Sequence, residues 1–275
     1  GRFRRLMLEK FTLKMPKEEI VRFINNYLYV DENSANAIYE YFKEQYQYVR
    51  AIPTDRTILV EHYDENGMKK VIFHTLFGRR VNDCLSRAVA FVISRSQHKN
   101  VEISINDNGF YIGSTKKVQV VNALKLLNSE KLPLVMKAAI DESEVFKRRF
   151  RHCAARALMI LRSYKGKQKR IGRQQVSSVI LMNALKRISA DFPILKEARR
   201  EVLEDLMDIQ NTQWVLKQIE EGKIVLKEIS TTVPSPFSFN IVLQGVMDIL
   251  KIEDKVEFLK RMHKMVLAKI RRDNP

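Results

Sequence analysis

Apolar side chains recur every three or four residues over most of this chain, which is the pattern of amphipathic helices. The first two such runs cover residues 16–30 and 31–48. Pro16, with the acidic Glu18 and Glu19, is typical of a helix N-terminus, and we predict a helical hairpin here. The same spacing predicts further helices over residues 79–95, 115–127, 133–140, 173–188, 191–206, 210–220 and 253–272.

Two runs rich in β-branched and aromatic residues, 57–63 and 68–75, flank the turn sequence Asp-Glu-Asn-Gly and predict a β-hairpin. A second hairpin is predicted around Asn-Asp-Asn-Gly, between strands 101–105 and 110–112, and one more strand at 224–232. We therefore expect an α+β fold, predominantly helical, with a small antiparallel β-sheet or partial barrel. We read one domain, 1–275, made of a helical hairpin, a part with β-hairpins and helices, and a helical part with a basic helix, at 1–50, 51–140 and 141–275.

The densest charge lies in residues 144–175, which contain eleven Lys or Arg and one acid, Glu144. Helical spacing continues through this stretch, and its apolar stripe consists of Phe146, Phe150, Cys153, Ala154, Ala157, Leu158, Leu161 and Tyr164. The pattern predicts a helix that extends to the region of Tyr164 and leads into a cationic loop. One face of this helix has to be buried, and the basic remainder is available to an anionic partner.

The whole chain is strongly basic, since its 275 residues have a formal net charge of +17 and a pI near 9.8. Such an excess favours polyanions, namely DNA, RNA or an acidic membrane surface; a solvated basic surface without a single partner is the alternative. With 45% hydrophobic residues the chain can form a sizeable core. Cys84 and Cys153 lie in apolar helical phase, which predicts buried, reduced thiols in an intracellular protein.

Motifs for catalysis are absent from the sequence. The five histidines have no paired-ligand spacing, serine and cysteine lack a nucleophile elbow, and the phosphate loop GxxxxGK[ST] does not occur. We therefore predict no catalytic residue, no metal site and no cofactor within this chain. No run of 18 apolar residues predicts a membrane span. The first residue is Gly1 rather than Met, and we expect a segment of a longer protein.

Several blocks of the sequence together resemble one family. They are IPTDRTILVEHY at 52–63, HTLFGRRVNDCLSRAVAF at 74–91, the basic stretch 144–175, FPILKEARREVLEDLMDI at 192–209 and VPSPFSFNIVLQG at 233–245. In this order they are similar to the large helicase-related (Lhr) family of superfamily 2 helicases, most closely to its archaeal members. The matching region of that family is the DEAD/H-associated domain, which follows two RecA-like motor domains and a winged helix.

The resemblance implies a parent enzyme that uses ATP to translocate 3′ to 5′ on single-stranded DNA and to unwind DNA or RNA–DNA duplexes, as in DNA repair. ATP and Mg²⁺ belong to the motor domains of such an enzyme, so this chain is expected to bind nucleic acid without ATPase activity. Its expected partners are single-stranded DNA or an RNA–DNA hybrid and its own motor and winged-helix domains, with no membrane. A cytoplasmic, nucleoid-associated location is expected.

A set of residues is predicted to contact the strand, the cations through phosphates and the glutamines through sugar or phosphate oxygens. They are Arg79, Arg80, Leu85, Arg148, Arg149, Arg151, Arg156, Lys165, Lys167, Lys169, Arg170, Arg173, Gln174 and Gln175. Arg79 and Arg80 fall in the first turn of a predicted helix, where cations oppose the helix dipole; they are either a phosphate site or an exposed pair. Bacterial relatives tend to have an aromatic residue near Leu85, which itself could only act as a wedge.

The basic helix presents two sets of arginines. Arg149 and Arg156 share one flank with His152, while Arg148, Arg151 and Arg162 lie opposite the apolar stripe. Both sets cannot easily reach one strand, so some are expected to be solvated or paired with acids. The charge-mixed helix 191–206 is interpreted as a solvated face. The alternative to nucleic-acid binding is a structural brace that packs on the motor domains or on a partner protein; a free-standing nuclease or glycosylase lacks the acidic or metal constellation it needs.

Overall fold

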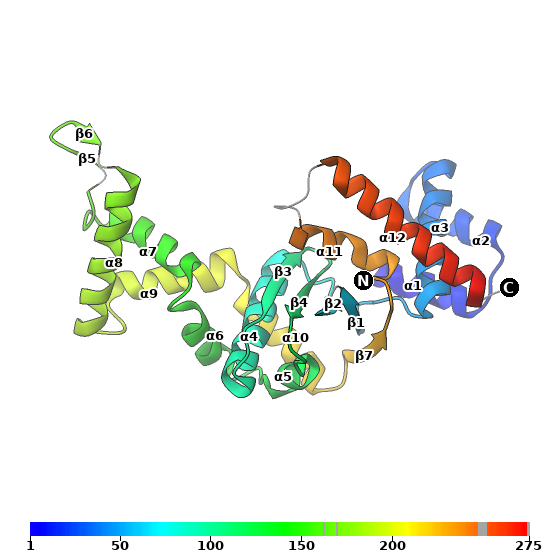
Figure 1. Cartoon of the computed structure of the whole chain (residues 1–275), viewed down its shortest axis with the longest axis horizontal. Helices are drawn as coiled ribbons and strands as arrows, with labels where there is room; N and C mark the ends of the chain where they lie inside the picture. Colours follow the sequence, from blue (N-terminus) through cyan, green and yellow to red (C-terminus); the bar gives the residue numbers. More distant parts are fainter. Residues whose placement is uncertain (66, 162, 169, 247–251, 274–275) are drawn as a thin grey trace.

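The computed structural model describes residues 1–65, 67–161, 163–168, 170–246 and 252–273. The molecule is elongated, with a β-sheet near the middle and helices at both ends (Figure 1). Three parts follow one another along its long axis: the N-terminal helices with the C-terminal helix, a central body around the sheet, and a distal lobe of helices. The predicted α+β, predominantly helical fold is confirmed.

The N-terminal part is a cluster of three helices, which are α1 (Arg2–Thr12), α2 (Lys17–Leu28) and α3 (Glu32–Val49). α2 and α3 form the predicted hairpin, and the carboxylate of Asp31 caps α3 by accepting the N–H of Ser34 at 2.9 Å. α1 is a third helix beyond that prediction, and its Met7 is fully buried in a cluster with α2 and α3. The long helix α12 (Ile252–Asp273) packs beside α3 through Val266 (Figure 1).

The central sheet has five strands in the order β3–β4–β2–β1–β7. They are β1 (Thr57–Glu65), β2 (Met68–His74), β3 (Glu102–Asn106), β4 (Gly109–Ser114) and β7 (Val225–Ser230). Both predicted hairpins are present as antiparallel pairs, and Asp64 Oδ1 accepts the N–H of Gly67 in the first turn at 3.0 Å. β7 runs parallel to β1, because the chain returns to the sheet only after a long helical crossover. The sheet is therefore mixed rather than wholly antiparallel.

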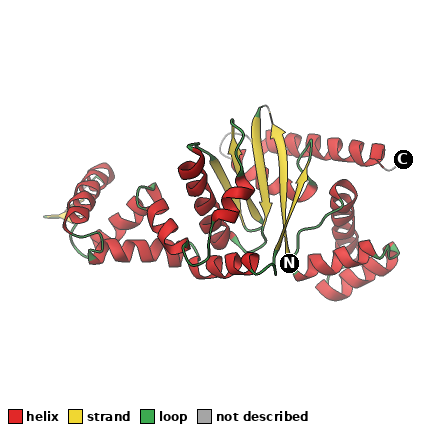
Figure 2. Cartoon of the chain, turned by 90° about the horizontal axis from the view of Figure 1, so that it is seen from below, coloured by secondary structure: helices red, strands yellow, loops and turns green. Residues whose placement is uncertain are grey.

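Helices cover both faces of this sheet (Figure 2). The helices of one face are α4 (Arg79–Gln97), α5 (Val120–Leu126), α6 (Leu132–Ile140) and α10 (Ile209–Glu220). Their apolar side chains and those of the strands form the main core, in which the stacked rings of Phe73 and Phe110 have centroids 4.8 Å apart. The other face is covered by α11 (Phe239–Val246), whose Ile241 is fully buried in one cluster with Ile72.

The distal lobe projects from the central body (Figures 1 and 2). Its elements are α7 (Glu144–Arg156), the short strands β5 (Ser163–Tyr164) and β6 (Lys167–Gln168), α8 (Ile171–Ile188) and α9 (Pro193–Arg200). A six-residue π-helix, η1 (Glu201–Leu206), continues α9 back to the central body. Within the lobe, the outer helix α8 packs mainly on α7 and α9.

α7 is shorter than predicted, because the chain leaves the helix after Arg156. Leu158 adopts a left-handed conformation with a φ of 58°, and the N–H of Ile160 returns to the carbonyl oxygen of Ala154 at 3.2 Å. This places Ile160 in the core at 6% exposure, while Leu158 is 75% exposed. The prediction that the helix and its apolar stripe extend to the region of Tyr164 is therefore wrong.

A buried carboxylate attaches the segment between β7 and α11 to the sheet. Glu61 of β1 is fully buried, and it accepts hydrogen bonds from the N–H and Oγ of Ser235 at 2.6 and 2.7 Å and from Ser238 Oγ at 2.5 Å. His74 Nε2 lies 3.3 Å from the same carboxylate. Burial acts to raise the pKa of Glu61, but the hydrogen bonds from these three residues outweigh it and lower that pKa. The 3₁₀ turn η2 (Pro236–Ser238) is thereby fixed to β1 and β2.

Candidate nucleic-acid interface

α7 is held in the distal lobe by one apolar face. Ser143 caps its N-terminus by accepting the N–H of Phe146 at 3.2 Å, and Phe146, Phe150 and Ala154 are fully buried. Spacing of three and four residues puts these side chains on one side of the helix. The arginines of α7 therefore lie outside this face, on two different flanks.

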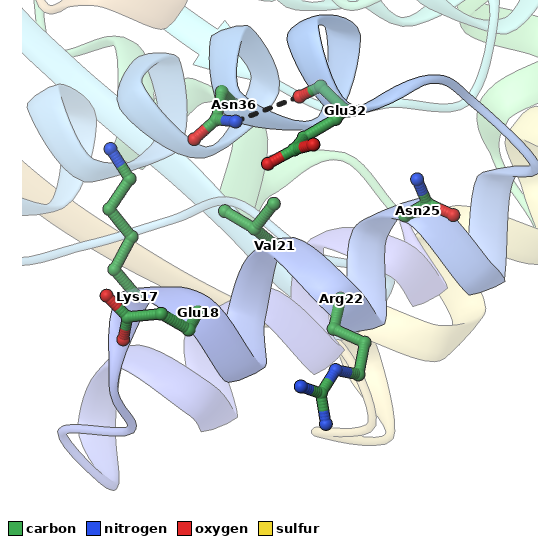
Figure 3. Close-up of a pocket in the computed structure, with 7 residues that line it drawn as sticks. All are labelled: Lys17, Glu18, Val21, Arg22, Asn25, Glu32 and Asn36. Carbon is green, nitrogen blue, oxygen red and sulfur yellow. Dashed lines mark hydrogen bonds between the residues drawn. The ribbon is translucent and has the colours of Figure 1, made fainter.

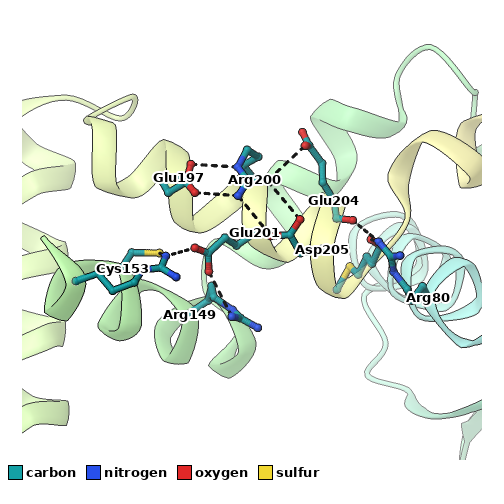
Figure 4. Close-up of polar contacts among 10 residues, drawn as sticks. Arg80, Arg149, Cys153, Glu197, Arg200, Glu201, Glu204 and Asp205 are labelled. Atoms are coloured by element: carbon teal, nitrogen blue, oxygen red, sulfur yellow. Dashed lines mark hydrogen bonds and ion pairs between the residues drawn. The ribbon is translucent and has the colours of Figure 1, made fainter.

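The first flank, defined by Arg149 and Arg156, faces the carboxylate of Glu201 (Figure 4). Glu201 begins η1 and is only 4% exposed. Arg149 Nη1 lies 3.3 Å from Glu201 Oε2, as an ion pair without hydrogen-bond geometry, and Arg156 Nη2 pairs with Glu201 Oε1. The hydrogen bond to Glu201 raises the pKa of Arg156. A carboxylate with so little access to water requires a cationic partner, so this flank stabilises the contact between α7 and η1.

The charge-mixed segment 191–206 is therefore not wholly a solvated face, and that prediction is wrong for two residues. Besides Glu201, Arg199 is buried, and its guanidinium donates to both carboxylate oxygens of Asp141 at 2.8 and 3.0 Å. Arg200, by contrast, stays at the surface and pairs with neighbouring acids (Figure 4). The two buried charges connect the distal lobe to its neighbours through charge-assisted contacts.

The second flank, defined by Arg148 and Arg151, faces the N-terminal half of α8. These arginines and Gln175 line a groove of about 280 Å³ between the two helices. Glu144 and Lys147 also line the groove, and Glu144 is 2.8 Å from Lys147 Nζ. No carboxylate among the described residues pairs with Arg148 or Arg151. Two unpaired guanidinium groups with an amide beside them suit a phosphate. We call this feature the α7–α8 groove.

A short hairpin extends the basic surface beyond α7 (Figure 1). Its turn has positive φ at Lys165 (48°) and Gly166 (73°), as in a two-residue type I′ turn. The predicted cationic loop is therefore a β5–β6 hairpin followed directly by α8. Lys167, Arg170 and Arg173 are exposed along it and at the start of α8, and none of them pairs with a described carboxylate.

The N-terminus of α4 has partners within the protein. The N–H of Arg79 donates to Asp107 Oδ1 at 3.3 Å. The Arg80 guanidinium donates to the carbonyl oxygens of Glu204 and Met207 at the end of η1, the latter at 3.1 Å (Figure 4). The Asp107 carboxylate and these carbonyl oxygens thus take the position in which a bound anion was predicted. Through its two contacts, Arg80 fixes η1 to the central body. The side chain of Arg79 remains exposed.

The remaining predicted contacts differ in their surroundings. Leu85 is fully buried in the main core, because α4 turns this position toward the sheet, so its prediction as a wedge in nucleic acid is wrong for this fold. Lys165 and Gln174 each interact within the chain. Lys169 and Arg162 lie outside the described residues. The predicted cations that the structure brings together without a described acidic partner are therefore Arg148 and Arg151 of the α7–α8 groove and Lys167, Arg170 and Arg173 of the hairpin and the start of α8.

A hollow outside the distal lobe contains charges of both signs rather than cations alone. This hollow of about 450 Å³ lies between α2 and α3, and its lining includes Lys17, Glu18 and Arg22 (Figure 3).

Cys84 and Cys153 are buried as predicted, and burial raises the pKa of their thiols to about 12 and about 11. The described residues contain no cluster of His, Cys, Asp and Glu that fits Mg²⁺ or another metal ion. No described helix is long and apolar enough to cross a membrane.

Known proteins match this chain in sequence and in structure. A family model described as DEAD/H associated matches residues 52–238. The chain belongs to the DEAD/H-associated family. The ATP-dependent helicase Lhr-Core of Methanothermobacter thermautotrophicus is 51% identical to it over 98% of this chain and 31% of the relative. The Lhr-Core of Saccharolobus solfataricus is 38% identical over 98% of this chain and 32% of the relative.

This DEAD/H-associated chain also resembles a solved helicase. The structure of Mycobacterium smegmatis helicase Lhr bound to ssDNA and AMP-PNP matches it with a TM-score of 0.68 and 27% identity, over 77% of this chain and 27% of that one. The predicted resemblance to Lhr helicases, with archaeal relatives the more similar, is confirmed. The chain spans about a third of the length of the curated Lhr-Core relatives that it matches.

The structural roles of two carboxylates of the DEAD/H-associated domain, Glu201 and Glu61, were not predicted from the sequence. Glu201 lies among other acids and bases of similar spacing, and only its contact with α7 distinguishes it from them. Glu61 did leave a signal, because its same-face neighbours in the strand, Leu59 and Tyr63, are both apolar or aromatic. An acid between two such positions is expected to be buried with hydrogen-bond donors around it.

Proposed function

We propose that this DEAD/H-associated domain binds the single strand on which a longer ATP-dependent helicase moves 3′ to 5′. The observation that carries the proposal is the α7–α8 groove, where Arg148 and Arg151 are unpaired and Gln175 lies beside them. The exposed Lys167 of the adjoining hairpin and Arg170 at the start of α8 extend the same surface. The similarity to a helicase solved with ssDNA supports this choice of ligand.

The groove suits a nucleic-acid backbone rather than a base sequence. Guanidinium groups bind phosphates, which repeat identically along every strand, while the bases vary. Binding should therefore be neutral to sequence and should weaken steeply as salt is raised. Because DNA and an RNA–DNA hybrid share this phosphate chemistry, both are included among the proposed ligands. ATP and Mg²⁺ would be held by the motor domains of the longer enzyme, and this chain would supply no step of hydrolysis.

Fluorescence anisotropy with labelled oligodeoxythymidine tests the proposal. Arg148→Ala combined with Arg151→Ala should weaken binding roughly tenfold or more, because two charge-assisted contacts are lost. The matched control is Arg271→Ala with Arg272→Ala, which removes the same charge from the exposed end of α12 and should weaken binding only about twofold. Equal losses in the two variants would contradict a site at the groove and would leave net charge as the cause.

A second function, as a brace between domains, is favoured by a separate observation. Val176 and Ile180 of α8 are among the exposed large apolar side chains of the molecule. Such side chains suit contact with protein rather than with phosphates. Because they lie away from the α7–α8 groove, the two functions use different faces of the distal lobe and can operate together.

A further inference from the structure

α8 has two apolar stripes, and only one of them is covered. Ser178, Met182 and Leu185 face the lobe and are buried. On the other side of the helix, Val176 and Ile180 are 61% and 64% exposed, and their spacing of four residues puts them on one face. Exposed apolar side chains grouped on one helix face are typical of an interaction surface. We call this face the outer face of α8.

Charge defines the chemistry of a partner for this face. Arg173 precedes Val176 by three residues and Arg187 follows Ile180 by seven, so both arginines fall on the outer face. They are roughly 21 Å apart along the helix axis. From residue 145 to residue 188 the chain contains no Asp or Glu. The outer face therefore offers its partner apolar groups and positive charge, and no carboxylate.

Two other occupants fit the outer face poorly. A second copy of α8 would bring its own arginines against Arg173 and Arg187 with no acid on either helix to pair with them. A nucleic acid would find no aromatic residue on α8 on which to stack its bases, and the groove arginines point to another side of the lobe. A polypeptide surface that combines apolar groups with carboxylates satisfies both features.

We propose that the outer face of α8 is a docking surface for the remainder of a longer Lhr-type helicase polypeptide. The docked surface has an apolar centre over Val176 and Ile180 and carboxylates opposite Arg173 and Arg187. We assign the docked surface to the same polypeptide because the chain matches only 31% of the Methanothermobacter Lhr-Core, and most of that relative lies outside the match. The inference rests on the proposed function, since it needs a longer helicase, but it uses a face separate from the groove.

Site-specific photo-cross-linking in a full-length protein tests this surface. The matched segment of the Methanothermobacter Lhr-Core is exchanged for this chain, and p-benzoylphenylalanine replaces Ile180. The control replaces Leu126 of α5, which is 68% exposed. Irradiation should link position 180 to a peptide of the remaining polypeptide in which apolar residues adjoin Asp or Glu. The yield should be roughly tenfold higher than at position 126.

Two substitutions on the outer face sharpen the test. Val176→Asp should reduce the cross-linking yield at position 180 roughly tenfold, and Arg187→Glu should reduce it as well, whereas Arg187→Lys should retain most of it. Because these side chains are exposed and lie outside the groove, the affinity for single-stranded DNA should fall by no more than the roughly twofold loss of the Arg271→Ala with Arg272→Ala control, which separates failure here from failure of the proposed function. Cross-links to a second copy or to nucleic acid, or a yield no higher than at the control position, would overturn the docking surface.

Discussion

The central body and the distal lobe contain charge in opposite arrangements. In the central body, Glu61 and His74 are fully buried, and the carboxylate is surrounded by hydrogen-bond donors. In the distal lobe, Arg148 and Arg151 line an open groove without a carboxylate partner in the described chain. The first arrangement stabilises a fold, whereas the second leaves charge available to a ligand. A cluster of cationic side chains therefore indicates a binding site only where those side chains have no carboxylate partner within the protein.

The same contrast recurs within the single helix α7. Arg149 and Arg156 pair with Glu201 and hold the lobe together, while Arg148 and Arg151 turn to the groove. Side chains of identical chemistry, a few residues apart, thus have different roles because their neighbours differ. Substitution of the carboxylates and of the arginines shows which of these charges stabilise the fold and which remain available to a ligand.

The largest effect is expected where the buried carboxylate of the central body is removed. Glu61→Ala should lower the free energy of unfolding by about 3–5 kcal/mol, because the donors of Ser235, Ser238 and His74 lose their acceptor in a site closed to water. Urea denaturation followed by circular dichroism measures this loss. A loss below about 1 kcal/mol would show that the central body does not depend on its buried charge.

The same carboxylate should make the central body sensitive to acid. The pKa of Glu61 is lowered below the ordinary 4.5 of a glutamate, so folding favours its charged form. Its contribution to stability is fully present above the unfolded value and is lost as the pH falls through the lower pKa of the folded state. The free energy of unfolding of Glu61→Gln should therefore fall less than that of the unmodified chain between about pH 6 and about pH 3. If the free energy of unfolding falls equally with pH in Glu61→Gln and in the unmodified chain, Glu61 does not have this role.

A smaller effect is expected at the junction of the distal lobe. Glu201→Gln should lower the free energy of unfolding by about 1–2 kcal/mol, because Arg149 loses its ion pair but stays partly solvated. Asp205→Asn, an exposed acid of the same π-helix, is the matched control and should change it by less than about 0.5 kcal/mol. If the two variants are equally stable in urea denaturation, Glu201 is not the acid that secures α7.

The smallest change in stability is expected at the groove. Arg148→Ala with Arg151→Ala should leave the free energy of unfolding within about 0.5 kcal/mol of the unmodified chain, because neither side chain has a partner to lose. The same urea titration measures it. A loss above 1 kcal/mol would place these arginines with Arg149 as structural residues and would remove the contrast between the two flanks.

Local chemistry was sufficient to predict the hairpins and most helices, because turn residues and apolar spacing decide them. The end of α7 could not be predicted in this way. The apolar spacing continues through Leu158 in the sequence, but a helix persists only where its stripe finds a packing surface. Here the burial of Ile160 ends it instead.

The choice between the two flanks of α7 could not be predicted either. Glu201 is 45 residues away from Arg156 in the chain, and only the path of α9 and η1 brings the two together. For Leu85, the family resemblance indicated a position at the surface, in contact with nucleic acid. The helix α4 instead places this side chain in the core. Partners distant in sequence, rather than local pattern, decide which cations remain free.

The salt dependence of binding to single-stranded DNA distinguishes a phosphate site at the α7–α8 groove from a general effect of net charge. On a plot of log affinity against log salt, Arg148→Ala with Arg151→Ala should reduce the slope by about 1.4, because two phosphate contacts of about 0.7 each are lost. Arg271→Ala with Arg272→Ala should keep the slope of the unmodified chain. An unchanged slope in the groove variant, or equal reductions in both variants, would contradict binding at the α7–α8 groove.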